Sequence, residues 1–313
     1  DNGDLWVGSF KREPLMEGQL TTVKITASVD ETMIEDPVIT NVLSYDKDIC
    51  EVVSWNNDTF VVKGIKSGYA NFLIKAIKVV DGKEHYGVWK QALFVNQKNT
   101  MIINKNGIDQ SFDLLNSIDP NCFCVCNPDG TKKDFLTIPL ANGEERINLT
   151  WNGDEVTYSE EIVSLHLYAT GNNIQVIHTH FLYGCKNLVD LDIWNAGNII
   201  AIDNFAFAKC SNFNQEIKLP KNIWNIGHFF MQDCKAYDKI IDLSPYPNLN
   251  SVNYGFMNGC DNFTSLNIGD VKTSEFNLEG VDNDNYTLST TNEDAVMYTN
   301  GIYITGNDVE SFI

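Results

Sequence analysis

Four cysteines recur at a nearly constant spacing and are the first residues in this chain whose type could carry chemistry. Cys185, Cys210, Cys234 and Cys260 are separated by 25, 24 and 26 residues. Thiolates bind metals, but zinc ligands cluster at short spacings and converge on one point. A constant step instead places one thiol in each turn of a repeating structure, along a line. We therefore expect four buried free thiols that act as small apolar fillers, and no metal site.

A second cysteine group is denser. Cys122, Cys124 and Cys126 alternate with other residues, so on a strand their side chains would project to one side. A metal site or a redox pair is one interpretation, yet histidine and acidic ligands are lacking nearby. A packed strand face is the interpretation that we favour.

Other chemical motifs are weak. No glycine-rich phosphate loop and no Gly-x-Ser-x-Gly motif occur. His178 and His180 are two apart, but equivalent repeats carry Asp, Phe, Gly or Asn there, which favours packing and turn roles. Asp282 and Asp284 partly match a calcium loop, but Thr287 stands where its sharp turn needs glycine. The hypothesis of a glycosidase acid pair stays open, but no two of the 42 acidic residues stand out as such a pair. We predict no catalytic residues and no cofactor.

Each repeat cysteine is the last residue of the same nine-residue sequence motif, which we call the cysteine phrase. An aliphatic residue stands eight positions before the cysteine, and an apolar pair occupies the fourth and fifth positions after that aliphatic. An apolar residue follows three positions after each cysteine, and then a short Leu-x-Leu-like strand. Residues 163–167 form an earlier strand of this kind without a cysteine phrase. Such a period predicts a solenoid, in which stacking of the units completes the core.

The combined phrase resembles the bacterial BspA-like leucine-rich repeats over residues 163–270. Ala206-Phe207, Cys210 and Leu219-Pro220 carry it best, and Ile226-Gly227 supplies the expected glycine. The resemblance implies one strand and a short helical or irregular segment per repeat, on a bacterial surface protein that adheres to host proteins or other cells. Repeats two and three have one extra residue before the strand, which leaves their register open by one.

The outward positions of the Leu-x-Leu strands form the candidate binding surface, on the face expected to be concave. Its row and flanking residues are His166, Tyr168, Asp190, Asp192, Trp194, Glu216, Lys218, Asp242 and Asn267. An exposed Trp194 would be a typical binding anchor. The alternative, that Trp194 packs into the turn after its strand, is equally open.

Residues 13–97 read as short β-strands separated by turns, and Asp81-Gly82 between two apolar runs predicts a hairpin. Several such strands favour a small antiparallel sandwich. The stretch from Phe60 to Ala70, with Gly64 and Gly68, resembles the bacterial Ig-like domain of group 2, a family that mostly supplies spacers or stalks. We expect an Ig-like β-sandwich at 1–97, a linker and N-terminal cap at 98–160, repeats at 161–270 and a C-terminal cap at 271–313.

The overall composition argues against nucleic-acid-binding and membrane-spanning proteins. With 42 acidic and 22 basic residues, the formal charge of −20 disfavours nucleic acid. No apolar run is long enough to span a bilayer. The chain begins at Asp1, which suggests a removed export signal, and a lipid anchor there would give peripheral membrane attachment.

We therefore expect a mainly β, two-domain, non-catalytic protein, exported to the bacterial surface as a monomer. Its expected partner is a host or cell-surface protein, or a glycan. Two alternatives stay open: a glycan-binding accessory protein or glycan hydrolase of a nutrient-uptake system, and an architectural spacer.

Overall fold

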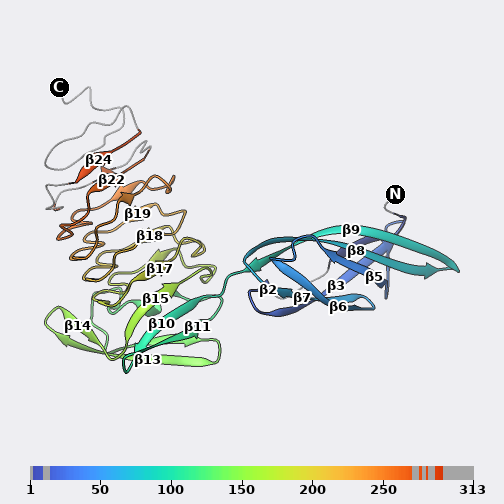
Figure 1. The fold of residues 1–313 in the computed structure, drawn as a ribbon, viewed down its shortest axis with the longest axis horizontal. Helices are drawn as coiled ribbons and strands as arrows, with labels where there is room; N and C mark the ends of the chain where they lie inside the picture. Colours follow the sequence, from blue (N-terminus) through green and yellow to red (C-terminus); the bar gives the residue numbers. More distant parts are fainter. Residues whose placement is uncertain (1–2, 10–14, 270–274, 277–279, 281–285, 292–313) are drawn as a thin grey trace. The chain divides into compact units, whose positions relative to one another are not determined.

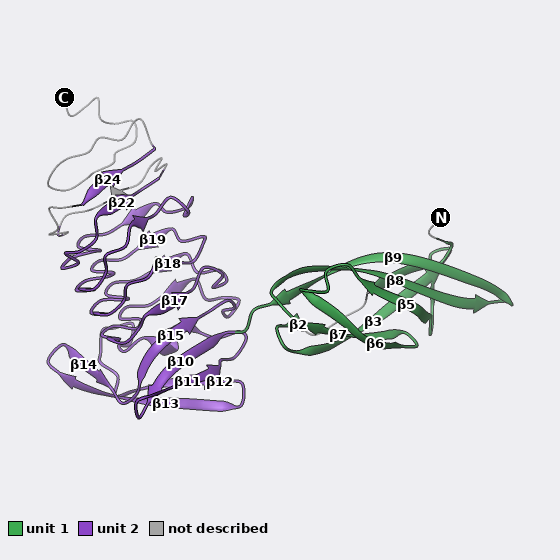
Figure 2. Cartoon of the chain, in the orientation of Figure 1, with its two compact units in different colours: residues 1–98 green, residues 99–313 purple. Residues whose placement is uncertain are grey.

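The computed structural model describes residues 3–9, 15–269, 275–276, 280 and 286–291. The described residues are mainly β and contain no α-helix. The chain divides into two compact units, residues 1–98 and 99–313, which Figure 2 colours separately. Asp282 and Asp284, the residues that partly match a calcium loop, and most of the predicted C-terminal cap lie outside the described residues.

Unit 1 consists of two sheets that share one hydrophobic core. The first sheet has the order β1 (Trp6–Ser9), β3 (Leu20–Val29), β7 (Thr59–Gly64) and β6 (Cys50–Asn56), with β4 (Thr32–Ile34) beside β3. The second has the order β2 (Leu15–Met16), β9 (Lys83–Asn96), β8 (Gly68–Val80) and β5 (Val38–Ser44). Neighbouring strands are antiparallel except β2 and β9. The strands alternate buried and exposed residues, because each sheet buries one face.

Turn chemistry sets the hairpins of unit 1. Val80 pairs with Lys83 across a two-residue loop, as the Asp81-Gly82 sequence predicts. Asp81 and Gly82 both have positive φ angles, 52° and 77°, which a tight hairpin of this kind requires. Gly64 is needed for a different reason: a Cβ there would lie 2.4 Å from the Met16 carbonyl oxygen.

Unit 2 is a β-solenoid closed at its beginning by antiparallel strands (Figure 1). Five parallel two-residue strands form one face: β16 (Val176–Ile177), β18 (Ala201–Ile202), β19 (Asn225–Ile226), β21 (Ser251–Val252) and β23 (Glu275–Phe276). The first four begin the phrases that end in cysteine, and we call this sheet the Cys-phrase face.

The Leu-x-Leu strands form the other face, which is split in two. One sheet has the order β11 (Ile108–Asp113), β10 (Thr100–Lys105), β15 (Glu161–His166) and β17 (Asp190–Asp192). The other has the order β20 (Ile241–Asp242), β22 (Ser265–Asn267) and β24 (Thr287–Ser289). Residues 213–219, where a strand is predicted, form none, so that prediction is wrong.

Residues 99–160 lie in unit 2, where Met101 and Ile103 join its core. They supply β10, β11 and a sheet of β12 (Phe135–Leu140), β13 (Gly143–Asn152) and β14 (Glu155–Tyr158). Antiparallel pairing of β10 with β15 covers the first coil, which would otherwise expose an open sheet edge.

Candidate binding surface of the repeat region

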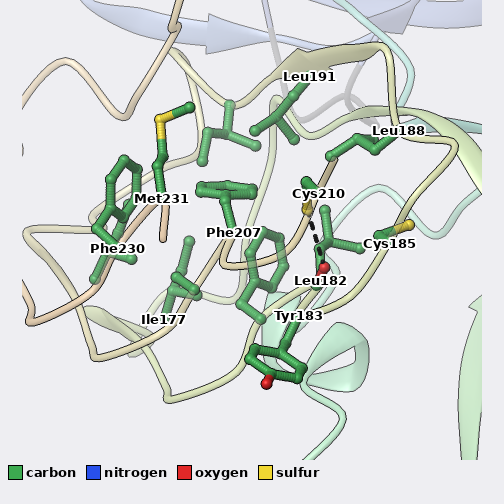
Figure 3. Packing of buried hydrophobic residues seen from close by; sticks show 14 of the residues in the cluster. Ile177, Leu182, Tyr183, Cys185, Leu188, Leu191, Phe207, Cys210, Phe230 and Met231 are labelled. Carbon is green, nitrogen blue, oxygen red and sulfur yellow. Dashed lines mark hydrogen bonds between the residues drawn. The ribbon is translucent and has the colours of Figure 1, made fainter. Parts of the chain in front are cut away.

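The repeat thiols lie inside the solenoid and form a regular hydrogen-bonded series. Cys185, Cys210, Cys234 and Cys260 are free and buried. Each thiol donates to a main-chain carbonyl of the preceding coil: Cys210 to Leu182 at 3.3 Å (Figure 3), Cys234 to Phe207 at 3.2 Å and Cys260 to Met231 at 2.9 Å. Cys185 donates in the same way to Ile162 at 3.3 Å. The thiols are therefore links between coils as well as apolar fillers.

Burial also makes three of these thiols, Cys185, Cys210 and Cys234, poor nucleophiles. It raises the pKa of Cys210 to about 12 and that of Cys185 and Cys234 well above the ordinary thiol value. The reactive thiolate is therefore scarce at neutral pH. Among the residues that the structure describes, no group of three or more His, Cys, Asp or Glu side chains could hold a metal ion.

The second cysteine group does not lie on a strand, contrary to the sequence prediction. Residues Pro120–Phe123 form a 3-10 helix, capped by the Asp119 side chain, which accepts from the Asn121 N–H. Proline at the first helical position favours this turn. Cys124 and Cys126 are buried and Cys122 is partly buried. Cys124 donates to the His178 carbonyl at 3.5 Å, so it connects the cap to the first cysteine phrase.

The histidines of that phrase are turn residues. His180, Phe205 and Phe229 occupy the same repeat position, and all three have left-handed φ angles of 53–58°. Their rings stack, with centroids 5.1 Å apart for both His180–Phe205 and Phe205–Phe229. Phe205 therefore has a stacked ring on each of its two faces. Burial lowers the pKa of His180, which keeps the ring neutral within this column.

The predicted outward row is present in register at both ends of the Leu-x-Leu face. His166 pairs with Asp192 across β15 and β17, and Asp242 pairs with Asn267 across β20 and β22. These four side chains are partly exposed. Glu216 and Lys218 are exposed in the segment without strands between the two sheets.

A polar cluster occupies the first part of this row. His166 Nε2 lies 2.6 Å from Asp190 Oδ2, and the Ser164 hydroxyl donates to the same oxygen at 3.3 Å. The Tyr168 hydroxyl lies 3.4 Å from Asp192 Oδ2. These hydrogen bonds hold the side chains of the cluster in fixed positions.

Tyr246 explains the break in the Leu-x-Leu face. Its hydroxyl accepts from the Leu219 N–H at 2.9 Å and donates to the Ile217 carbonyl at 3.2 Å. In the preceding coil, the N–H group equivalent to that of Leu219 belongs to Ile193. It donates to a main-chain carbonyl, that of Lys218. A side chain thus replaces the strand pairing between the second and third coils.

Trp194 is held by the same side chain. It is partly buried against the core, and its ring centroid lies 5.6 Å from that of Tyr246. Of the two interpretations of Trp194, packing after its strand describes its position. It is not a free anchor.

The exposed tryptophan of the repeats is Trp224, which the sequence interpretation missed. Trp224 is 49% exposed on the Cys-phrase side, and Ile200, 38% exposed, lies beside it in the preceding coil. The Trp224 N–H donates to the Ile200 carbonyl at 2.6 Å, and its own carbonyl accepts from Asn250 and Ser251 at 2.8 and 3.1 Å. The sequence clue was its position two residues before the phrase aliphatic, which Gln175, Ile200 and Asn250 occupy in the other repeats.

A cavity of about 440 Å³ lies in the cap, lined by residues that include Cys122, Lys132, Lys133 and Asp134. It presents one carboxylate, so it does not supply the two acids that glycoside hydrolysis uses. Among the described residues, no helix is long and apolar enough to cross a membrane.

Residues 157–278 match the family model of the BspA type leucine rich repeat region, in six copies. This region of the chain is a BspA-type repeat region. The match extends beyond the residues 163–270 on which the sequence resemblance rested, at both ends. BspA-type repeats are typically non-catalytic modules of bacterial surface or secreted proteins and suggest a role in protein interaction. No curated protein and no solved structure matches the chain.

Proposed function

We propose that this chain is an exported module of a bacterial cell surface that binds a protein partner through its repeat region. Residues 1–98 act in this proposal as an Ig-like stalk, and the chain as a monomeric, non-catalytic adhesin. The BspA-type match over residues 157–278 is the observation that carries it. The two-sheet core and the turns around Gly64 and Gly68 support the stalk role.

Rigidity supports a binding role for the repeats. Parallel strand pairs, thiol hydrogen bonds and the stacked ring column each connect successive coils. A surface that is already ordered loses little conformational entropy when a partner binds. The pre-positioned cluster of His166, Asp190 and Asp192 has this property.

Charge and exposed apolar groups indicate the kind of partner. Residues 99–313 hold 28 acidic and 11 basic residues, whereas residues 1–98 hold 14 and 11. A partner with a basic surface suits the acidic repeat region, since opposite potentials speed the encounter. Trp224 and Ile200 supply an exposed apolar anchor of the type that dominates binding energies.

The test is binding of the whole chain to an array of purified extracellular-matrix proteins and glycans. An Asp192→Asn/Asp242→Asn variant removes two charges from the outward row without changing side-chain size. We expect a protein hit whose association slows in the variant and at high salt. A glycan-only profile would favour the accessory-protein alternative. Silence across the array would favour an architectural spacer.

A further inference from the structure

The second sheet of unit 1 has an outer face with an unusual composition. Of the 20 large hydrophobic side chains that the described residues expose, 13 lie in unit 1. On β5, β8 and β9 the residues that alternate with the buried ones point outward. We call their surface the β5-β8-β9 face; Figure 2 places the three strands in unit 1.

Aromatic and aliphatic side chains occupy both ends of this face. At one end Tyr69 and Phe94 are directly paired, with ring centroids 4.8 Å apart, and Tyr69 is 69% exposed. At the other end Val38, Ile77 and Tyr86 are register neighbours on the three strands. The eight residue-to-residue steps from Tyr69 to Ile77 span about 26 Å at ~3.3 Å per step.

Two lysines lie between the apolar ends. Lys75 pairs with Val88, and Lys90 is two residues further along β9, so the two lysines are diagonal neighbours. Such positions are about 7–8 Å apart. Both are exposed. The salt bridges described in unit 1 join Lys24 to Asp58, and Lys83 and His85 to Asp4, so neither face lysine takes part.

The outward positions between the two apolar ends carry no acidic residue. One carboxylate lies near the face: Asp46 accepts from the main-chain and side-chain N–H groups of Asn71 at 2.8 and 3.0 Å. These bonds, together with the charge of Lys90, lower the pKa of Asp46. A protein whose formal charge is −20 thus has an open patch where two ammonium groups stand without acids between them. Such a patch favours an anionic ligand.

The pattern fits a sugar chain better than a protein surface. Lysine is depleted at the centre of protein interfaces, and a second copy of this face would bring the lysines together. Pyranose rings have apolar C–H faces that pack on aromatic rings, and hydroxyls that accept from ammonium and amide donors such as Asn41. An extended chain also needs no groove, only a flat surface of sufficient length.

We propose that the β5-β8-β9 face binds an extended glycan bearing carboxylate or sulfate groups. Tyr69 and Phe94 pack on the sugar rings, while Lys75 and Lys90 pair with the anionic groups. Unit 1 has 14 acidic and 11 basic residues, so its local field opposes an anion only weakly. Charges of unit 2 beyond about 8 Å are screened at physiological salt.

The test is isothermal titration of the whole chain with size-fractionated polygalacturonate, hyaluronate and heparin, and with neutral dextran. The test variants are Lys75→Gln/Lys90→Gln and Tyr69→Ala. The matched control is Lys24→Gln/Lys66→Gln, which removes the same charge at exposed positions outside the face. Circular dichroism checks that every variant is folded.

We expect at least one acidic glycan to bind, with at least tenfold weaker binding in each test variant and less than twofold change in the control. Higher salt should weaken binding further. The proposal is overturned by no binding of any acidic glycan at millimolar concentration, or by equal loss in the control. Tighter binding of dextran than of every acidic glycan overturns it too. None of these outcomes concerns the repeat region, so the proposed function is tested separately.

Discussion

At the scale of single residues, the thiol hydrogen bonds give the repeat cysteines a role that their spacing alone does not specify. A constant step predicts that equivalent residues line up, because each coil repeats the same path. The step does not say whether a side chain finds a partner. The acceptors are turn carbonyls three residues before the preceding cysteine, for example Leu182 before Cys185 and Phe207 before Cys210.

The thiol links predict an order of stability among variants. Cys210→Ala removes both the packing and the hydrogen bond, and we expect it to cost about 2–3 kcal/mol. Cys210→Ser keeps a donor aimed at the Leu182 carbonyl, so it should cost less, about 1 kcal/mol. Urea unfolding of the whole chain measures both. A serine variant less stable than the alanine variant would contradict the hydrogen bond to Leu182.

Glu161 predicts a pH-dependent effect. Its Oε2 is buried with no hydrogen-bond partner among the described residues, and burial raises its pKa above the ordinary 4.5, while Lys186 opposes the shift. The folded state therefore favours the neutral acid. The stabilisation that Glu161 contributes to the free energy of unfolding is fully present below pH 4.5 and is lost as pH rises through the raised pKa.

Glu161→Gln should accordingly stabilise the protein at pH 7 by on the order of 1 kcal/mol. At pH 4 the variant and the parent should unfold together. Thermal unfolding at the two pH values measures the difference. An equal gain at both pH values would show that ionisation of Glu161 has no part in it.

At the scale of elements, the ring column explains how bulky residues tolerate a left-handed backbone. Phe229 has a φ angle of 53°, which costs a non-glycine residue about 1–2 kcal/mol. Stacking on Phe205 offsets part of this cost. The fourth repeat instead has Gly255 at this position, with a φ angle of 66°, and Phe229 packs against Tyr254.

This geometry predicts an inverted order of substitutions. At most positions in a protein, a variant with glycine is less stable than the variant with alanine. At position 229 we expect Phe229→Ala to be less stable than Phe229→Gly by about 1 kcal/mol, because only glycine is free of the left-handed strain. Chemical unfolding of the two variants measures this order directly. The usual order would refute strain at this turn.

The break between the second and third coils is the other element-scale feature. Tyr246→Phe removes the hydroxyl that pairs with the Leu219 N–H and the Ile217 carbonyl. We expect a loss of about 1–3 kcal/mol, typical of an unpaired buried polar group, and faster hydrogen exchange at Leu219.

Tyr254→Phe is the matched control for Tyr246→Phe. It makes the same chemical change in the next repeat, where the described residues offer the Tyr254 hydroxyl no hydrogen bond, and we expect little effect. Unchanged exchange at Leu219 in Tyr246→Phe would show that the hydroxyl does not hold the two coils together.

At the scale of the whole molecule, local sequence patterns predict only part of the fold. The period predicts the stacked coils, and Asp81-Gly82 predicts its hairpin, because both depend on residues close together in the chain. The fate of Trp194 depends on Tyr246, 52 positions later, and no local pattern contains that contact. The missing strand at residues 213–219 has the same origin. Trp224 was overlooked because the equivalent position carries no aromatic residue in the other repeats.

The central claim is that the repeat region holds the binding energy for a protein partner. Trp224 and Trp6 offer a matched comparison, because each is 49% exposed, one in the repeats and the other in unit 1. The decisive measurement is the dissociation constant of the protein hit from the array for Trp224→Ala and for Trp6→Ala. We predict at least tenfold weaker binding in Trp224→Ala, as for an interface anchor, and less than threefold change in Trp6→Ala. The reverse pattern would place the binding surface in unit 1 and contradict the claim.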